Sequence, residues 1–356
     1  MGTPEEQNPD TGQPAADDAG TEPVGDSTTC EKPMDQAVLN WKERAREVTE
    51  RIARGELEQM VELLLDDDED RRYEAARDIA KAGQVVIPRA LELAEDARPR
   101  MRKMACYILG QVGYPDPDYP LLLIRHPDGI PTLVRHLESD SDEHVRATAA
   151  HALGFHHDEA VSAAPALCRA AHDSSDEIRF GVAHALGSFG EGAWEIAEDR
   201  QNQKAVREAL LRLMDDVDED VRDWATFGIH QGGHDTPETR ARLWQALDDP
   251  CPDVRGEAAA GLAKFGDRSL IPRLDQLLRE DPALHSCFFD VAKQLGDPCL
   301  LPAVLVGAER WRQWMEAGEE LHYAITSAIK ALGKAAAAVG KGERGSSEDE
   351  SNVASK

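Results

Sequence analysis

Six arginines recur along this chain, and each is followed by small or apolar residues at the same distances. They are Arg72, Arg102, Arg146, Arg179, Arg222 and Arg255. An Asp stands six residues before each Arg, at Asp66, Asp96, Asp140, Asp173, Asp216 and Asp249. Small or apolar residues follow at offsets of three, four and seven, as Ala149, Ala150 and Leu153 follow Arg146. Because these offsets lie on one stripe of an α-helix, the pattern predicts one helix that recurs with the same buried face, as in a solenoid of stacked helices.

The spacing of the arginines sets the size of the repeating unit. Successive arginines are 30, 44, 33, 43 and 33 residues apart, so the basic unit has 30 to 33 residues and two units are longer. A unit of this size holds two short helices and two turns. Proline at a first helical position loses no helical hydrogen bond, and five prolines fit the start of the first helix. They are Pro88, Pro131, Pro165, Pro237 and Pro272. Each unit is predicted to run as helix A, an acidic turn, helix B with the Arg, and a loop.

The segment Asp140 to Gly154, DSDEHVRATAAHALG, resembles the HEAT repeat in its short bacterial form, also called the phycobilisome-lyase HEAT-like repeat. The resemblance covers about residues 56–300. It implies an all-α, right-handed α-solenoid of about seven to eight helix pairs. It also implies that the Asp and the Arg are structural and hydrogen-bond from one repeat to the next. An Arg near a helix start needs an anionic partner, which agrees with this role, and we expect no catalysis from these residues.

Composition divides the chain into five parts. The first part, residues 1–34, is rich in Asp, Glu, Gly, Pro, Thr and Ser and is expected to be a disordered acidic tail. Apolar residues at helical spacing then predict an N-terminal cap helix at 35–55. The repeats at 56–300, whose pattern decays past Arg255, are followed by a helical cap at 301–339. Residues 340–356 are expected to form a second disordered tail.

The net charge of −28 limits the kinds of partner. With both tails set aside, the body still carries an excess of 19 acidic residues, 55 against 36 basic ones. Such a body repels phosphate backbones, so we expect no nucleic-acid binding. No apolar run is long enough for a signal peptide or a membrane span, which predicts a cytoplasmic protein without membrane contact. The six cysteines form no CxxC motif, and neither disulfides nor zinc are expected.

Helix B is expected to present a concave surface at offsets of two, five and nine from each Arg. In the central repeats these offsets carry Met104, Tyr107, His151, Phe155, His184, Trp224 and Phe227. An aromatic and Met-bearing strip on a concave surface suits a groove that binds a protein or peptide, and acidic rims favour a basic segment in that partner. The alternative is that these side chains fill the gaps between helices. Exposure of Trp224 and Phe227 distinguishes the two.

The two longer units carry insertions that follow helix B. The first, Gly113 to Gly129, has four prolines around the apolar run Leu121 to Ile124, and the second, Gly190 to Gln203, contains Trp194. Long loops are often functional, so both are secondary candidates for partner contact. The favoured alternative for Leu121 to Ile124 is a flap that folds back over the adjacent helices, because an exposed apolar run promotes aggregation.

Histidines raise an enzymatic alternative. His156 and His157 stand beside Asp158 and Glu159, and imidazoles with carboxylates can hold iron or zinc. The di-iron deoxyhypusine hydroxylases carry His-Glu dipeptides, but this chain has none, so His156 and His157 are expected to be solvated turn residues.

The predicted function is a non-catalytic interaction scaffold without a cofactor, a metal or catalytic residues. The alternative is a HEAT-like enzyme or enzyme accessory, similar to bilin lyases or to metal-dependent oxidoreductases, with a metal or a tetrapyrrole at His151 and His184. Fold alone does not supply chemistry, and no phosphate loop or nucleophile motif is present in the sequence.

Overall fold

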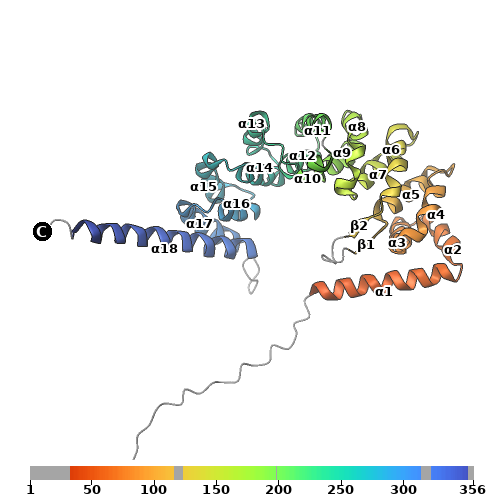
Figure 1. Cartoon of the computed structure of the whole chain (residues 1–356), viewed down its shortest axis with the longest axis horizontal. Coiled ribbons are helices and arrows are strands. Elements are labelled where there is room, and N and C mark those ends of the chain that lie inside the picture. Colours follow the sequence, from red (N-terminus) through yellow and green to blue (C-terminus); the bar gives the residue numbers. More distant parts are fainter. Residues whose placement is uncertain (1–32, 116–122, 198, 314–321, 352–356) are drawn as a thin grey trace, which may run out of the picture.

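Eight helix pairs follow one another in an arch (Figure 1), in a computed structural model that describes residues 33–115, 123–197, 199–313 and 322–351. The A helices lie on the outer rim of the arch and the B helices on its inner, concave side. The predicted all-α solenoid is therefore confirmed. The A helices are α2 (Leu57–Glu62), α4 (Ile87–Leu93), α6 (Ile130–Ser139), α8 (Ala164–Ala170), α11 (Arg200–Leu213), α13 (Pro237–Ala246), α15 (Ile271–Glu280) and α17 (Leu301–Arg312). The B helices are α3 (Glu69–Lys81), α5 (Pro99–Gln111), α7 (Glu143–Gly154), α9 (Asp176–Gly187), α12 (Glu219–Gln231), α14 (Pro252–Lys264), α16 (Cys287–Leu295) and α18 (Tyr323–Ser351).

Remaining elements cap or connect the pairs. Helix α1 (Pro33–Ala53) packs on α3 and covers the first repeat, and a short helix α10 (Glu191–Ala197) precedes α11. Strands β1 (Gly113–Pro115) and β2 (Leu123–Arg125) pair antiparallel. Short 3-10 helices occupy the joints: η1 (Leu63–Leu65), η2 (Gly83–Val86), η3 (Pro127–Gly129), η4 (His157–Ala163), η5 (Arg268–Leu270) and η6 (Pro298–Leu300).

Proline and aspartate begin the helices as the sequence predicts. All five predicted prolines stand in the first turn of their A helices. Several B helices begin after an Asp whose side chain accepts backbone N–H groups of the first turn; Asp142, for example, accepts those of His144 and Val145. These caps satisfy amides that have no partner within the helix. The predicted stripe is buried, since Ala149, Ala150 and Leu153 have no exposed surface.

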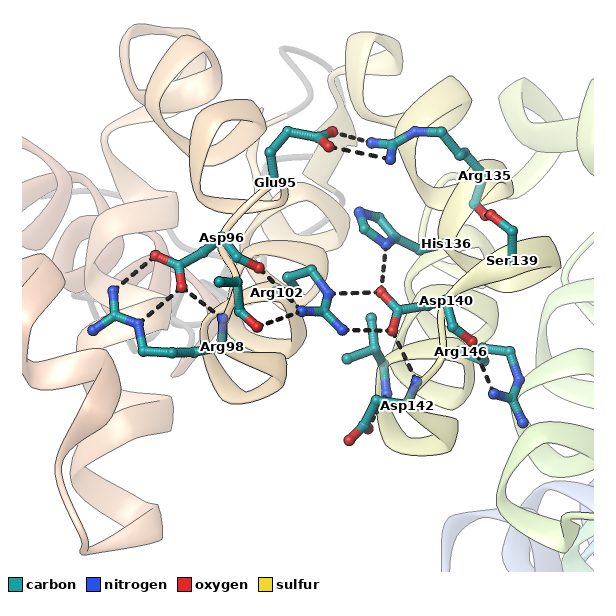
Figure 2. A network of polar contacts seen from close by, with 12 residues as sticks. Glu95, Asp96, Arg98, Arg102, Arg135, His136, Ser139, Asp140, Asp142 and Arg146 are labelled. Atoms are coloured by element: carbon teal, nitrogen blue, oxygen red, sulfur yellow. Dashed lines mark hydrogen bonds and ion pairs between the residues drawn. The ribbon is translucent and has the colours of Figure 1, made fainter.

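Arginine and aspartate form a ladder along the B helices (Figure 2). Nη1 of Arg102 donates to the carbonyl oxygen of Asp96, 3.0 Å away in its own turn. Its Nε and Nη2 each donate at 2.8 Å to the carboxylate of Asp140 in the next repeat. The same inter-repeat pair recurs as Arg179–Asp216, Arg222–Asp249 and Arg255–Asp281. Arg72 and Arg146 donate to the carbonyl oxygens of Asp66 and Asp140 in their own turns. The structural role implied by the resemblance is thus confirmed.

The Asp carboxylates also close the turns that precede the B helices. Oδ1 of Asp140 accepts the N–H of Asp142 at 2.9 Å, and Oδ2 contacts Nδ1 of His136 at 2.9 Å. Burial alone would raise the pKa of Asp140, but the hydrogen bonds from Arg102, Asp142 and His136 outweigh it and hold that pKa well below its usual range. The carboxylate is therefore ionised whenever the protein is folded near neutral pH.

Three segments differ from the sequence-based expectations. Helix α18 runs to Ser351, whereas 340–356 was expected to be a disordered tail. Its first turns are anchored by buried Ala324, Ile325 and Leu332, and no proline follows that would stop the helix. The second insertion contains a helix, α10, and the first contains the β1–β2 ribbon. Leu121 and Leu122 of the expected flap, and residues 1–32 of the expected acidic tail, lie outside the described residues.

Within the part of the chain that the structure describes, no helix combines the length and the apolar character needed to cross a bilayer.

Candidate functional site

A groove of about 530 Å³ lies on the concave side, across the B helices α3, α5, α7 and α9 and the start of α12. Its lining comes from side chains that point away from the A helices. Aromatic and imidazole rings in the lining are Tyr73, Tyr107, His151, Phe155 and Phe180. Charged side chains in the lining are Lys103, Asp176, Glu177, Asp218 and Asp220. Ala147, Thr148, Ala152 and Gln111 complete it.

Two glycines outside the groove lining bring α7 and α9 close together. A Cβ on Gly181 of α9 would lie 2.9 Å from the carbonyl oxygen of Ala147 on α7, so only glycine permits this approach of the two helices. Gly154 of α7 is similarly confined, because a Cβ there would lie 2.2 Å from Nδ1 of His184. Close backbones leave little side-chain bulk between α7 and α9, and larger rings from either side stand around the resulting recess.

Ring contacts form the walls of the groove. Tyr73 and Tyr107 meet edge to face, with ring centroids 4.9 Å apart. His151 stacks on Phe155 at 5.1 Å and meets the edge of Phe180 at 5.7 Å. Such pairs hold the rings in fixed positions, so the walls are preorganised for a ligand.

The ring contacts continue beyond the groove toward α12 and form what we call the aromatic ridge. His184 contacts His151 at 4.4 Å and Trp224 at 4.5 Å. Trp224 in turn contacts Phe227 at 5.6 Å, and Phe227 contacts His230 at 5.4 Å. A continuous series of rings therefore joins the groove to α12.

Three of the seven residues predicted for the concave strip line the groove, namely Tyr107, His151 and Phe155. Trp224 and Phe227 are half-buried and lie on the aromatic ridge outside the groove. Their partial exposure falls between the two interpretations that the sequence left open: the rings pack on one another and still reach the surface.

Met104 and His184 correct the prediction, because both are buried, with 1% and 7% of their surface exposed. Met104 stands two residues after its Arg, as Gly181 does in the fourth repeat. Offset two has no single environment, because Gly181 lies close against α7 whereas Thr148 lines the groove. Met104 packs in the hydrophobic core and only borders the depression beside Lys103. His184 is buried because the rings of His151, Phe155 and Trp224 cover it.

Among the groove residues that the predicted strip lacked, three large side chains share one offset. Tyr73, Lys103 and Phe180 each stand one residue after the repeat arginine. Offset one lies one helical turn before offset five, so these side chains stand on the same face as Tyr107 and His151. An extension of the concave strip to offset one would have found them.

The groove carries opposite charges at its two ends. At the end over α5, Nζ of Lys103 lies 5.8 Å from the centre of the Tyr73 ring. An adjacent depression of about 220 Å³ is lined by Arg72, Arg100 and Lys103, with one carboxylate, Asp142, and His144. The far end carries the carboxylates of the first turns of α9 and α12. We call these the basic end and the acidic end.

Between the two ends, Nδ1 of His144 lies 2.7 Å from Glu177. The hydrogen bond and the charge of Glu177 raise the pKa of His144.

Sequence families agree with this geometry. Residues 130–229 and 206–285 match the family of HEAT repeats, and residues 99–155 match the HEAT-like repeat. The chain belongs to the HEAT repeat family. The matched residues include α5, α7, α9 and α12, so four of the helices that line the groove are B helices of HEAT repeats.

Relatives with HEAT-type stacking are found among known proteins. Protein YibA of Escherichia coli K12 is 25% identical over 253 residues, which are 69% of this chain and 83% of YibA. YibA of Escherichia coli O157:H7 gives the same values. An X-ray structure of YibA has a TM-score of 0.54 at 24% identity and covers 77% of this chain and 91% of its own. This likeness concerns the fold.

The histidines of the HEAT repeats are mostly packed side chains. Burial lowers the pKa of His151, and burial with the nearby His151 lowers the pKa of His184 to about 3, so His184 is neutral at pH 7. His156 is 2% exposed rather than solvated as expected, because it packs at the end of α7, while His157 is exposed. Among the residues that the structure describes, no group of three or more His, Cys, Asp or Glu side chains is placed to hold a metal ion.

The two insertions offer fewer side chains for partner contact than the sequence suggested. Trp194 is 5% exposed and meets the edge of Phe189 at 5.7 Å, so this ring is not available to a partner. Arg125, at the end of the β1–β2 ribbon, lies over the ring of Phe155 at 5.7 Å. The first insertion thus supports one wall of the groove.

Proposed function

We propose that this protein is a non-catalytic scaffold that binds a segment of a partner protein in the concave groove. The observation that carries the proposal is the combination of ordered rings with a charged rim on the inner face of the solenoid. Tyr, Trp and other rings at the centre of an interface supply most of its binding energy. Tyr107, His151 and Phe155 stand where such anchors are needed.

The extent of the surface favours a polypeptide over a small molecule. Rings line the concave face from α3 to α12, which is four intervals between neighbouring B helices. Packed helices lie 8–10 Å apart, so the surface is about 32–40 Å long. An extended chain rises about 3.3 Å per residue, so about ten to twelve residues would cover it.

The charge of the protein supports a partner segment that contains basic residues. The acidic end presents Asp176, Asp218 and Asp220 beside the rings. Carboxylates at a rim speed the encounter with a basic segment and contribute less to final affinity than the buried rings do. Partner capture is therefore expected to weaken as salt is raised.

The alternative of a metal or tetrapyrrole enzyme at His151 and His184 stays a hypothesis from the sequence. No specific observation favours it, and His184 lies beneath the rings of Phe155 and Trp224 instead of facing the groove.

Site-specific photo-cross-linking tests the proposal. A benzophenone amino acid is placed at Gln111, in the groove wall, and in a matched control at Arg212, which is exposed on the convex helix α11. Cross-linked peptides are sequenced by mass spectrometry. We expect one partner segment to be captured at Gln111 and not at Arg212, and the yield to fall when Tyr107→Ala and Trp224→Ala are added to the Gln111 protein. The same capture from both positions, or a yield unaffected by the two alanines, would remove the groove from consideration.

A further inference from the structure

The opposite charges at the two ends of the groove indicate the order of charges in the segment that would bind there. Lys103 at the basic end is half-buried, and none of the described carboxylates forms a salt bridge with it. Its neighbour Arg72 is already engaged, because Nη1 donates to the carbonyl oxygens of Asp66 and Asp67. Arg100 lies 3.6 Å from the carboxylate of Asp67, so Lys103 is the cation of the basic end that forms no salt bridge with a described carboxylate.

At the acidic end the free charge has the opposite sign. Asp176 and Asp220 stand in the first turns of α9 and α12 and form no salt bridge with any described side chain. Asp218 caps α12 by accepting the N–H groups of Asp220 and Val221, at 3.0 and 3.1 Å. Two carboxylates thus remain available for a cation, with Asp176 two helix intervals and Asp220 three helix intervals away from Lys103.

We infer that the groove selects an extended segment with an acidic side chain at one end and a basic side chain at the other, an inference that rests on the proposed function. The acidic side chain pairs with Lys103, and the basic side chain pairs with Asp176 and Asp220. Apolar or aromatic residues between them lie against Tyr107, His151 and Phe155. Neither an all-basic nor an all-acidic segment satisfies both ends.

The geometry sets the distance between the two charges. From α5 to α9 there are two intervals of 8–10 Å, or about 16–20 Å. An extended chain rises about 3.3 Å per residue, so a basic side chain that pairs with Asp176 is about five or six residues from the acidic one. Partly exposed ion pairs contribute modestly, so the charges fix the register of the segment while the rings supply most of the affinity.

Selection from a phage-displayed library of random peptides, about twelve residues long to span the surface, tests the inference on the full-length protein. We expect enriched peptides with an apolar or aromatic centre between an acidic and a basic residue at this spacing. Selection on Lys103→Glu should replace the acidic position by a basic one, with about a tenfold loss of affinity for the original peptides. Selection on Asp176→Lys/Asp220→Lys should replace the basic position by an acidic one.

The outcomes separate the inference from the proposed function. One outcome contradicts the inferred charge order and still supports binding in the groove. In that outcome the enriched peptides lose affinity for Tyr107→Ala/Phe155→Ala but bind Lys103→Glu as they bind the wild type. Peptides that bind Tyr107→Ala/Phe155→Ala as well as the wild type would overturn both. Unfolding midpoints within the wild-type range confirm that each variant is folded.

Discussion

Arg255 and Asp281 form a two-point ion pair that joins the sixth repeat to the seventh, with Nε–Oδ2 at 2.9 Å and Nη2–Oδ1 at 2.7 Å. Both residues are more than nine-tenths buried. The seventh repeat keeps the Asp of the pattern although its B helix lacks the Arg and buries Phe288 and Phe289 instead of alanines. The ladder of ion pairs therefore ends at the carboxylate of Asp281. Its pair with Arg255 anchors the irregular C-terminal repeats to the regular ones.

Arg255→Ala is expected to destabilise the C-terminal repeats by about 3–5 kcal/mol, because it leaves the Asp281 carboxylate buried without its cation. Hydrogen exchange should quicken in α15 and α16, and the urea midpoint should fall. Arg279→Ala is the matched control: its pair with Asp275 lies within one helix and is partly exposed, so less than about 0.5 kcal/mol is expected. Equal effects from the two variants would argue against a structural ladder.

Acid should destabilise the protein through three buried histidines, His156, His184 and His234. Burial lowers their pKa values to about 4, about 3 and about 4, helped by the charge of Arg125 on His156 and of Arg207 on His234. Unfolded histidine takes up a proton near pH 6.5, so stability is complete above that pH and is lost as pH falls toward 4. By pH 5 each histidine costs about 2 kcal/mol, from about 1.36 kcal/mol per unit.

Urea unfolding at pH 7.5 and pH 5.0 measures this loss. His184→Leu should make the difference between the two pH values smaller, because this ring takes up a proton only in the unfolded chain. A difference as large as that of the wild type would contradict the assignment of the effect to His184.

Asp223 should make the stability of the fold depend on pH in the opposite direction to the histidines. Burial, followed by the charges of Glu257, Asp253 and Asp220, raises its pKa to about 7, and its Oδ1 is buried without a hydrogen bond. The folded carboxyl keeps its proton longer than the unfolded one, so stability falls as pH rises from 3.8 toward 7. Asp223→Asn is expected to stabilise the protein at pH 8 by about 1 kcal/mol, after allowance for partial exposure. Calorimetric melting at pH 8 and pH 5 should show the larger gain at pH 8; a loss at pH 8 would contradict the prediction.

Much of the fold could be predicted because it depends on local spacing. The repeat arginines and the helix-starting prolines stand at fixed positions in the chain, and each acts within its own repeat or on the next. The insertions were less predictable, because nothing in residues 190–203 repeats, and Trp194 is held by the nearby Phe189 rather than by the repeat pattern. The continuation of α18 was missed because composition alone does not show that its first turns are anchored by packing.

The candidate site was predicted in part. Helical periodicity correctly placed Tyr107, His151 and Phe155 on the concave face. It could not show the environment of offset two, which differs between repeats with how closely the B helices approach, and the burial of Met104 was therefore missed. It also gave no sign that the ring of Trp224 would cover His184.

Glycines at the contacts between B helices should not tolerate a methyl group. A Cβ on Gly228 would lie 2.7 Å from Cα of Gly187, and backbone cannot move aside easily. Gly228→Ala is expected to cost about 1–3 kcal/mol. Gly333→Ala is the control, since nothing lies within 4 Å of a Cβ there and alanine favours a helix by about 1 kcal/mol. Thermal unfolding should show a lower midpoint for the first variant only; no decrease would mean that α9 and α12 can separate without cost.

The affinity of the partner segment captured at Gln111, prepared as a synthetic peptide, tests the central claim most directly. It is measured by fluorescence anisotropy with the wild type and with Tyr107→Ala/Phe155→Ala, after equal helical content has been verified. We predict at least about tenfold weaker binding to the double variant, which corresponds to the loss of about 1.4 kcal/mol from ring contacts in the groove. Equal affinity for the two proteins would contradict the account.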